Sequence, residues 1–185
     1  RYYTREAGVR SLERELANLS RKAVKDILLK KYESIRITRR NLDTYAGIRR
    51  YRHGEIDHGD SVGITNGLAY TDTGGDLLLI ETVSMPGKGK IIPTGKLGEV
   101  MQESVQASWS YVRSRAVDFG IKPPLFSKRD VHVHVPEGAV PKDGPSAGIA
   151  ITTSIVSVLT GNPVKSSVAM TGEVSLRGRV LPIGG

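Results

Sequence analysis

The segment best suited to chemistry is residues 141–148 (PKDGPSAG), directly before the apolar run of residues 149–159. Ser146 stands between Gly144 and Gly148, whose missing side chains let a backbone or a substrate come close. Pro145 has a φ angle that suits a first helical turn. A serine at a helix start has N–H groups and the positive dipole end beside it, which stabilise an oxyanion. Ser146 is therefore a candidate nucleophile, and the alternative is a serine that only caps the helix.

A nucleophilic serine needs a base, and the residues leave that base open. A Ser-His-Asp arrangement with Asp143 is possible, but no spacing selects it among the four histidines, His53, His58, His132 and His134. His132 and His134 share one face of a predicted strand and could bind a metal, although they lack a clear third ligand. Lys142 would have to be desolvated to act as a base, and its polar, glycine-rich surroundings give no reason for that.

Other kinds of site are excluded by what the chain lacks. It has no cysteine, which excludes a thiol nucleophile, a zinc ribbon, an iron–sulfur site and a disulfide scaffold. It contains neither a phosphate-binding loop nor a dinucleotide fingerprint. The longest apolar stretch, residues 149–159, is too short to cross a bilayer. Residues 87–90 (GKGK) could contact phosphate or could be only a flexible loop.

Charge divides the 185 residues into two parts. Residues 1–52 carry 15 Lys/Arg and 6 Asp/Glu, whereas residues 53–185 carry 12 and 13, so the net charge of +8 comes from the first part. This basic part could face a partner that is absent, or it could bind nucleic acid or another anionic surface. The difference predicts two domains, residues 1–52 and residues 53–185.

The elements of the first part are helical. Apolar residues at helical spacing predict an amphipathic helix over residues 9–28. A short helix is expected over residues 41–45, with Thr38 as its cap and Gly47 as its end. Residues 49–60 have no period and are expected to form a linker.

The second part mixes strands and helices, which predicts an α+β domain with a mixed sheet and flanking helices. Long helices are expected over residues 97–116 and 149–159, the second one buried. Gly74 and Gly75 are expected to form a turn. Strands are predicted in the remaining apolar segments: residues 62–65, 68–71, 77–83, 131–135, 168–171 and 180–181.

These motifs, taken together and in order, resemble one known family. The segments that carry the resemblance are residues 67–71, 74–76, 97–104, 141–150, 159–163, 170–173 and 181–185. They are similar to the proteolytic domain of the Lon ATP-dependent proteases. Residues 3–10 (YTREAGVR) resemble the end of the helical subdomain of the AAA+ module in the same proteins. The resemblance implies a Lon-type proteolytic domain preceded by the end of that subdomain.

The resemblance also implies roles for individual residues in a Ser-Lys dyad peptidase. Ser146 matches the nucleophile, and Thr171 matches the residue that hydrogen-bonds the catalytic lysine. Asp143 matches a loop acid that occupies the site in inactive states. Arg10 matches the sensor arginine that contacts nucleotide phosphates. Three further positions match residues near the substrate groove: His132, His134 and Glu137.

In the family the catalytic lysine follows the LPIGG stretch, which here ends at Gly185. The chain also begins without a methionine, so we expect an internal fragment that lacks the lysine and is inactive alone. ATP and Mg²⁺ would bind in the AAA+ module of the longer protein, and no cofactor or metal is expected in these residues.

The expected partners are unfolded protein substrates and further copies in a homohexamer. Weak non-specific DNA binding is possible, and no membrane contact is expected. The expected compartment is the bacterial cytoplasm, with the mitochondrial matrix as alternative. Two alternative functions remain: a Lon-like scaffold without peptidase activity, and an anion- or nucleic-acid-binding module.

Overall fold

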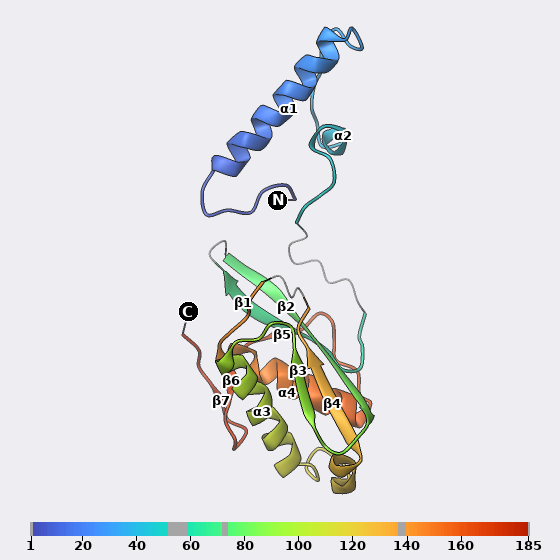
Figure 1. Cartoon of the computed structure of the whole chain (residues 1–185), viewed down its shortest axis with the longest axis vertical. Helices are drawn as coiled ribbons and strands as arrows, with labels where there is room; N and C mark the ends of the chain where they lie inside the picture. The colour runs from blue at the N-terminus through green and yellow to red at the C-terminus, as the bar shows by residue number, and fades with distance from the viewer. Residues whose placement is uncertain (1, 52–58, 72–73, 137–139, 185) are drawn as a thin grey trace. The chain divides into compact units, whose positions relative to one another are not determined.

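The computed structural model describes residues 2–51, 59–71, 74–136 and 140–184. The chain divides into two compact units (Figure 1). The smaller unit comprises Arg1–Glu55 and Thr71–Gly74, and the larger one comprises Ile56–Tyr70 and Gly75–Gly185. The predicted boundary between residues 52 and 53 falls outside the described residues and remains a prediction.

The smaller unit contains helices α1 (Arg10–Leu28) and α2 (Leu42–Ala46). Val9 at the start of α1 has no side chain that could cap a helix, and Glu6 takes over that role. Its carboxylate accepts hydrogen bonds from the backbone N–H groups of Ser11 (2.8 Å) and Leu12 (2.9 Å), which lowers the pKa of Glu6. No residue of α1 is buried within this unit, so its apolar stripe is left uncovered there.

Helix α2 ends at Gly47, as predicted, but the expectation that Thr38 caps it is wrong. The backbone N–H and the hydroxyl of Thr38 both contact the side-chain oxygen of Asn41, the residue at the actual start of the helix. Thr38 therefore closes the turn before α2: its carbonyl accepts from the N–H of Asn41 at 3.3 Å, but its side chain caps none of the N–H groups of the helix.

The larger unit is built on a five-stranded mixed sheet in the order β3-β4-β2-β1-β5. β4 is antiparallel to β2 and parallel to β3, and β1 is parallel to β5. The α+β prediction with a mixed sheet is thus confirmed. The strands are β1 (Ile64–Thr71), β2 (Gly74–Pro86), β3 (Ile91–Thr94), β4 (Arg129–His134) and β5 (Ala169–Met170).

Helices α3 (Glu99–Ser114) and α4 (Gly148–Thr160) pack on each other and on one face of this sheet. The alternation predicted for residues 131–135 sends Val131, Val133 and Val135 into the core, where each is fully buried. Directly before β4, the 3₁₀ helix η1 (Pro123–Ser127) closes the core with Phe126, whose ring centre lies 5.1 Å from that of Trp109. None of the described helices has the length and hydropathy required to cross a membrane.

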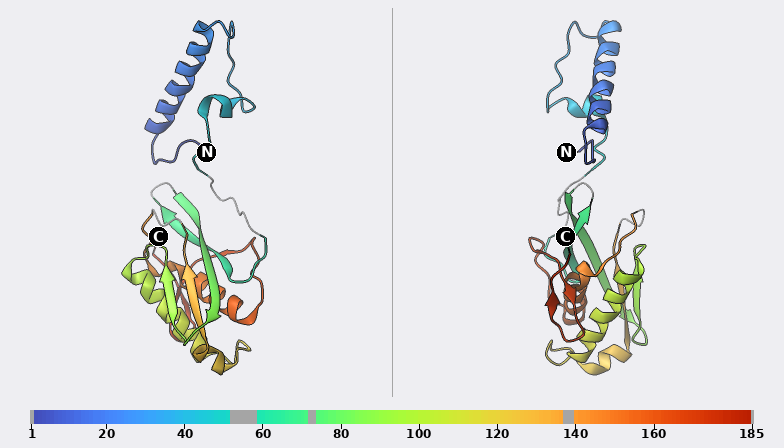
Figure 2. Two further views of the ribbon diagram at one scale, coloured as in Figure 1. Left: turned by 45° about the vertical axis from the view of Figure 1, so that its right-hand side comes forward. Right: turned by 90° about the vertical axis from the view of Figure 1, so that its left-hand side faces the viewer.

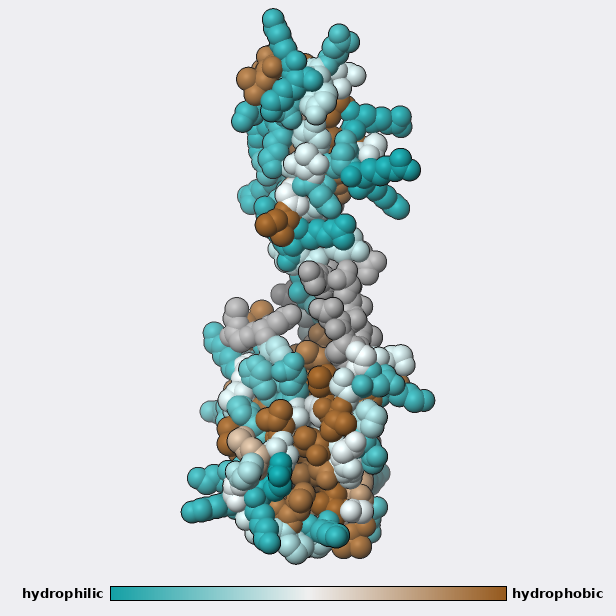
Figure 3. Space-filling model, turned by 90° about the vertical axis from the view of Figure 1, so that its right-hand side faces the viewer, coloured by the Kyte–Doolittle hydropathy of each residue, from teal (hydrophilic) through white to brown (hydrophobic). Residues whose placement is uncertain are grey.

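A separate two-stranded sheet, β6 (Glu173–Val174) with β7 (Val180–Leu181), packs beside α3 and α4. Figure 2 shows this pair and α3 on the same side of the unit. Apolar side chains also remain on the surface of the larger unit (Figure 3), and the strands β1 and β2 expose Leu68 and Val83.

Three sequence expectations differ from the observed elements. Gly74 and Gly75 belong to strand β2 and do not form a turn. Residues 62–65 and 68–71 were expected as two strands, and one strand, β1, covers most of them. β3 and β6 were not predicted; they have four and two residues, which show no period, whereas the equally short β5 and β7 fell within predicted apolar segments.

Candidate active site

The loop that carries Ser146 is a single 3₁₀ turn, η2 (Pro145–Ala147), which continues into α4. Gly144 precedes it with φ +109°, a conformation that L side chains rarely adopt. Gly148 is required for space instead, because a Cβ atom there would lie 2.8 Å from the backbone nitrogen of Val174. The two glycines around Ser146 thus have different roles: one permits the turn and the other lets α4 start against β6.

Thr171 and Gly172, which connect β5 to β6, are tied to this loop. The N–H of Gly172 donates to the carbonyl oxygen of Ser146 at 2.8 Å, and the hydroxyl of Thr171 donates to the same oxygen at 3.3 Å. In return the N–H of Ile149, in the first turn of α4, donates to the carbonyl of Gly172 at 3.0 Å. The structure therefore brings Thr171 next to Ser146, although 25 residues separate them.

The hydroxyl of Ser146 has no hydrogen-bond partner in the described part of the chain, and the residue is half-buried. Lys142, the nearest lysine in sequence, contacts the carbonyl oxygens of Gly95 (3.3 Å) and Val140 (3.2 Å). Its amine is thus engaged by carbonyl groups and not by the Ser146 hydroxyl. This geometry argues against Lys142 as the base.

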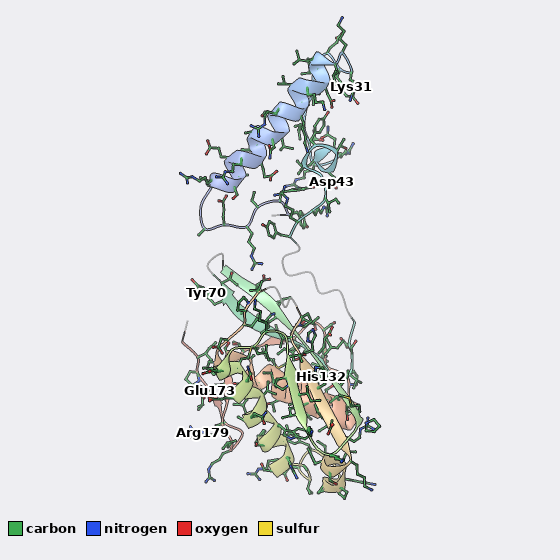
Figure 4. The ribbon with its side chains drawn as sticks, viewed as in Figure 1. Lys31, Asp43, Tyr70, His132, Glu173 and Arg179 are labelled. Atoms are coloured by element: carbon green, nitrogen blue, oxygen red, sulfur yellow. The ribbon has the colours of Figure 1, made fainter. Side chains whose placement is uncertain are left out.

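The histidines of β4 are held by the hydroxyl of Thr94 on β3. Its oxygen lies 2.8 Å from Nε2 of His132 and 2.7 Å from Nδ1 of His134. Both rings lie on the face of β4 opposite to its buried valines. In Figure 4, His132 lies on the strands, away from Glu173 of β6, the strand that directly follows Thr171 and Gly172.

No cluster of three metal-ligating side chains occurs among the residues that the structure describes. Three other candidates, His53, His58 and Glu137, lie outside the described residues. Arg10 is the exposed first residue of α1, in the smaller unit.

Asp143 holds the start of α3, a contact that the sequence did not reveal. Its Oδ1 accepts hydrogen bonds from the N–H of Met101 at 3.0 Å and from the N–H of Gly144 at 2.8 Å. Gly98 is the N-cap residue of α3 and has no side chain with which to cap it. A Cβ atom on Gly98 would lie 2.2 Å from Cγ of Asp143, so this carboxylate occupies the place of the missing cap.

A backbone contact strengthens the same junction, because the N–H of Gly98 donates to the carbonyl of Lys142 at 2.7 Å. The loop that carries Ser146 is therefore fixed on one side to α3 and on the other to the β5–β6 connection. The sequence analysis missed Gly98, Gly172 and Thr94. Gly98 fell inside the helix predicted over residues 97–116, and nothing in the sequence pointed to its partner.

Comparisons with known proteins identify the family of the chain. Residues 36–185 match the model of the Lon protease C-terminal proteolytic domain, and residues 1–35 match that of the Lon protease AAA+ ATPase lid domain. The chain is 70% identical over 187 residues to a Lon protease of Azospirillum brasilense, and 66% identical over 185 residues to one of Brucella abortus. All of this chain is covered in both cases, but only 23% of either relative, so the chain spans about a quarter of their length.

Proposed function

The chain belongs to the Lon protease family, and we propose that it supplies the proteolytic domain of an ATP-dependent serine endopeptidase in which Ser146 is the nucleophile. The observation that carries this proposal is the bonding of the Ser146 loop to Thr171 and Gly172 at the start of α4. This arrangement puts a half-buried serine beside a second hydroxyl and the N-terminal end of a buried helix, as acyl transfer requires.

The base in this proposal is a lysine that is not among these 185 residues. Lys142 and the two histidines of β4 have ring or amine nitrogens that already contact other groups. A lysine amine acts as a base only when burial lowers its pKa from about 10.4 towards neutrality. The Thr171 hydroxyl donates its proton to the Ser146 carbonyl, so its lone pairs stay available to accept from such an amine.

In the reaction, the lysine amine takes the proton of the Ser146 hydroxyl as Oγ attacks the peptide carbonyl. The oxyanion that forms lies at the start of α4, where the helix dipole favours negative charge. The protonated lysine then gives its proton to the leaving amine, and water hydrolyses the acyl-enzyme by the same route. Asp143 fixes the Ser146 loop to the start of α3. Movement of this carboxylate into the active site would block the site.

The remaining assignments concern the longer protein. We assign residues 1–52 to the end of the AAA+ lid and a linker, although the match to the proteolytic-domain model begins at residue 36, and residues 53–185 to the proteolytic domain, with Arg10 as the residue that senses nucleotide. ATP and Mg²⁺ would bind in the rest of that module and drive unfolded proteins towards Ser146 in a homohexamer. The high identity to bacterial relatives favours the bacterial cytoplasm.

The test compares the 185-residue chain with a version extended through the next lysine and the C-terminal helix. We expect no hydrolysis of a fluorogenic peptide by the chain itself, and slow, ATP-independent hydrolysis by the extended form. In the extended form Ser146→Ala should abolish cleavage, and Thr171→Val should lower kcat with an unchanged fold.

His132→Ala and His134→Ala are the matched controls and should each retain substantial activity. If either folded histidine variant were as inactive as Ser146→Ala, the base would be histidine and the Ser-Lys proposal would be wrong.

A further inference from the structure

A basic pocket lies where β2 ends and β4 begins, next to the 3₁₀ helix η1. The pocket has a volume of about 550 Å³, and its lining combines apolar residues of the 3₁₀ helix η1 and of β2 with three cations. The apolar lining is Pro86, Pro123, Pro124 and Leu125, and the cations are Lys122, Lys128 and Arg129. No acidic residue lines it.

The segments around this pocket are basic, whereas the rest of residues 53–185 is acidic. Residues 86–90 and 122–130 contain five of the twelve Lys/Arg in residues 53–185 but only one of the thirteen Asp/Glu. The rest of that part therefore has seven basic and twelve acidic residues, a net charge of −5. A solvated surface with evenly mixed charges would not give this separation.

The single acid of these segments, Asp130, is already bound to the backbone. Its Oδ1 accepts from the N–H groups of Lys88 and Lys90, both at 2.8 Å, and so fixes the loop between β2 and β3. The N–H of Gly87 donates to the carbonyl of Lys128 at 2.9 Å, which holds this loop against η1. The loop therefore presents Lys88 and Lys90, both exposed, beside the pocket.

Arg129 is oriented before any ligand arrives. Its Nε donates to the hydroxyl of Ser84 at 2.8 Å, and its Nη2 donates to the carbonyl of the same residue at 2.7 Å. Neither partner is charged, so the guanidinium keeps its positive charge available to an anion. No ion pair involves Lys122, Lys128 or Arg129 in the part of the chain that the structure describes.

We propose that this pocket binds an acidic peptide segment that carries an apolar side chain. The prolines and Leu125 form a surface for the apolar side chain, while Arg129, Lys122 and Lys128 pair with flanking carboxylates. The described residues of the pocket include no exposed aromatic ring for a nucleobase, since Phe126 is buried. A bare polyanion would leave the apolar surface unused. This site is separate from Ser146 and does not depend on peptidase activity.

The test measures binding of a fluorescein-labelled peptide of alternating glutamate and leucine to the 185-residue chain at physiological salt. We expect Lys122→Glu/Lys128→Glu, two exposed positions, to weaken binding by about tenfold or more. The matched control, Lys165→Glu/Arg177→Glu, reverses the same number of exposed charges on the same unit and should bind as the wild type does. Hydrogen exchange should show protection by the peptide in residues 121–129.

Three results would overturn the proposal. Equal binding by Lys122→Glu/Lys128→Glu would put the peptide on the basic residues 1–52 instead. Equal binding of a glutamate–serine peptide would mean that charge alone acts and the apolar surface does not. The third result is that inorganic polyphosphate or a single-stranded oligonucleotide displaces the labelled peptide at lower concentrations than the unlabelled peptide does. That result would identify a polyanion site.

Discussion

Single contacts in this protein join residues that are far apart in sequence, and the contact between Gly98 and Asp143 is one that can be tested. The φ and ψ angles of Gly98, −70° and 173°, suit any residue, so alanine would be disfavoured there only by its Cβ atom. That atom would lie 2.2 Å from Cγ of Asp143 and would displace the carboxylate from α3.

We expect Gly98→Ala to lower the free energy of unfolding by about 0.5–2 kcal/mol, the value of a helix cap, in urea denaturation. Asp143→Ala should cost a similar amount. Because both changes remove one interaction, the double variant should be scarcely less stable than either single variant. Fully additive losses would show that Gly98 and Asp143 act independently.

A second prediction at the residue scale concerns Asp130 and the dependence of the protein's stability on pH. Hydrogen bonds from the backbone N–H groups of Lys90 and Lys88 lower the pKa of Asp130 below its ordinary value of 3.8. A carboxyl with a lowered pKa in the folded state stabilises the protein above its unfolded pKa, and this contribution is lost as the pH falls through the folded pKa.

Asp130→Asn should therefore be less stable than the wild type at neutral pH, and the difference should shrink below about pH 4. Urea denaturation of both proteins across this range measures it. A difference that stays constant with pH would show that the charge of Asp130 has no part in holding the loop between β2 and β3.

At the scale of elements, α4 is a buried helix attached to the sheet through hydroxyl groups. Ser154 accepts a hydrogen bond from the hydroxyl of Thr82 on β2 (2.7 Å) and donates to the carbonyl of Ile151 (2.8 Å). Thr65 of β1 donates to the carbonyl of Ala150 at 3.0 Å, and Ser157 accepts from the N–H of Gly63 at 2.9 Å. Two of the hydroxyls that interrupt the apolar run of this helix, those of Ser154 and Ser157, thus contact β2 and the residue before β1, whereas the Thr153 hydroxyl donates to the carbonyl of Ile149 within the helix.

Ser154→Ala should lower the free energy of unfolding by about 1–3 kcal/mol, because it leaves the buried Thr82 hydroxyl without its acceptor. Combined with Thr82→Val, the loss should be smaller than the sum of the single losses. The matched control is Ser20→Ala in α1, an exposed serine that donates to the carbonyl of Leu16 and should change little. An equal loss for Ser20→Ala and Ser154→Ala would contradict the role given to the buried pair.

At the scale of the whole molecule, the two parts of the sequence differ in charge, since residues 1–52 have a net charge of +9 and residues 53–185 one of −1. We expect weak, sequence-independent DNA binding that falls steeply as the salt concentration rises. Fluorescence anisotropy with a labelled duplex measures this, and the comparison is a chain in which Arg14, Arg21 and Lys25 of α1 are changed to glutamine. Unchanged binding by that variant would remove the smaller unit as the DNA-binding surface.

The sequence by itself determined the features that depend on neighbours a few residues apart. The helices α1 and α3 and the strand β4 follow from apolar periodicity, which reports an apolar face of an element, and α4 follows from a nearly continuous apolar run. The Ser146 loop was recognisable because Gly144, Pro145 and Gly148 set its local backbone. The family resemblance rested on the same short motifs, and the matches to the two Lon family models confirm it.

Only the tertiary structure decided how these pieces meet. Asp143 caps a helix that begins more than 40 residues earlier, Thr94 holds two histidines of another strand, and Thr171 reaches Ser146 across 25 residues. Strand β3 became recognisable only through its pairing with β4. Such contacts depend on the packing of α3 and α4 against the sheet. A sequence pattern records that a residue is buried or polar, but the partner that satisfies it is chosen by the fold.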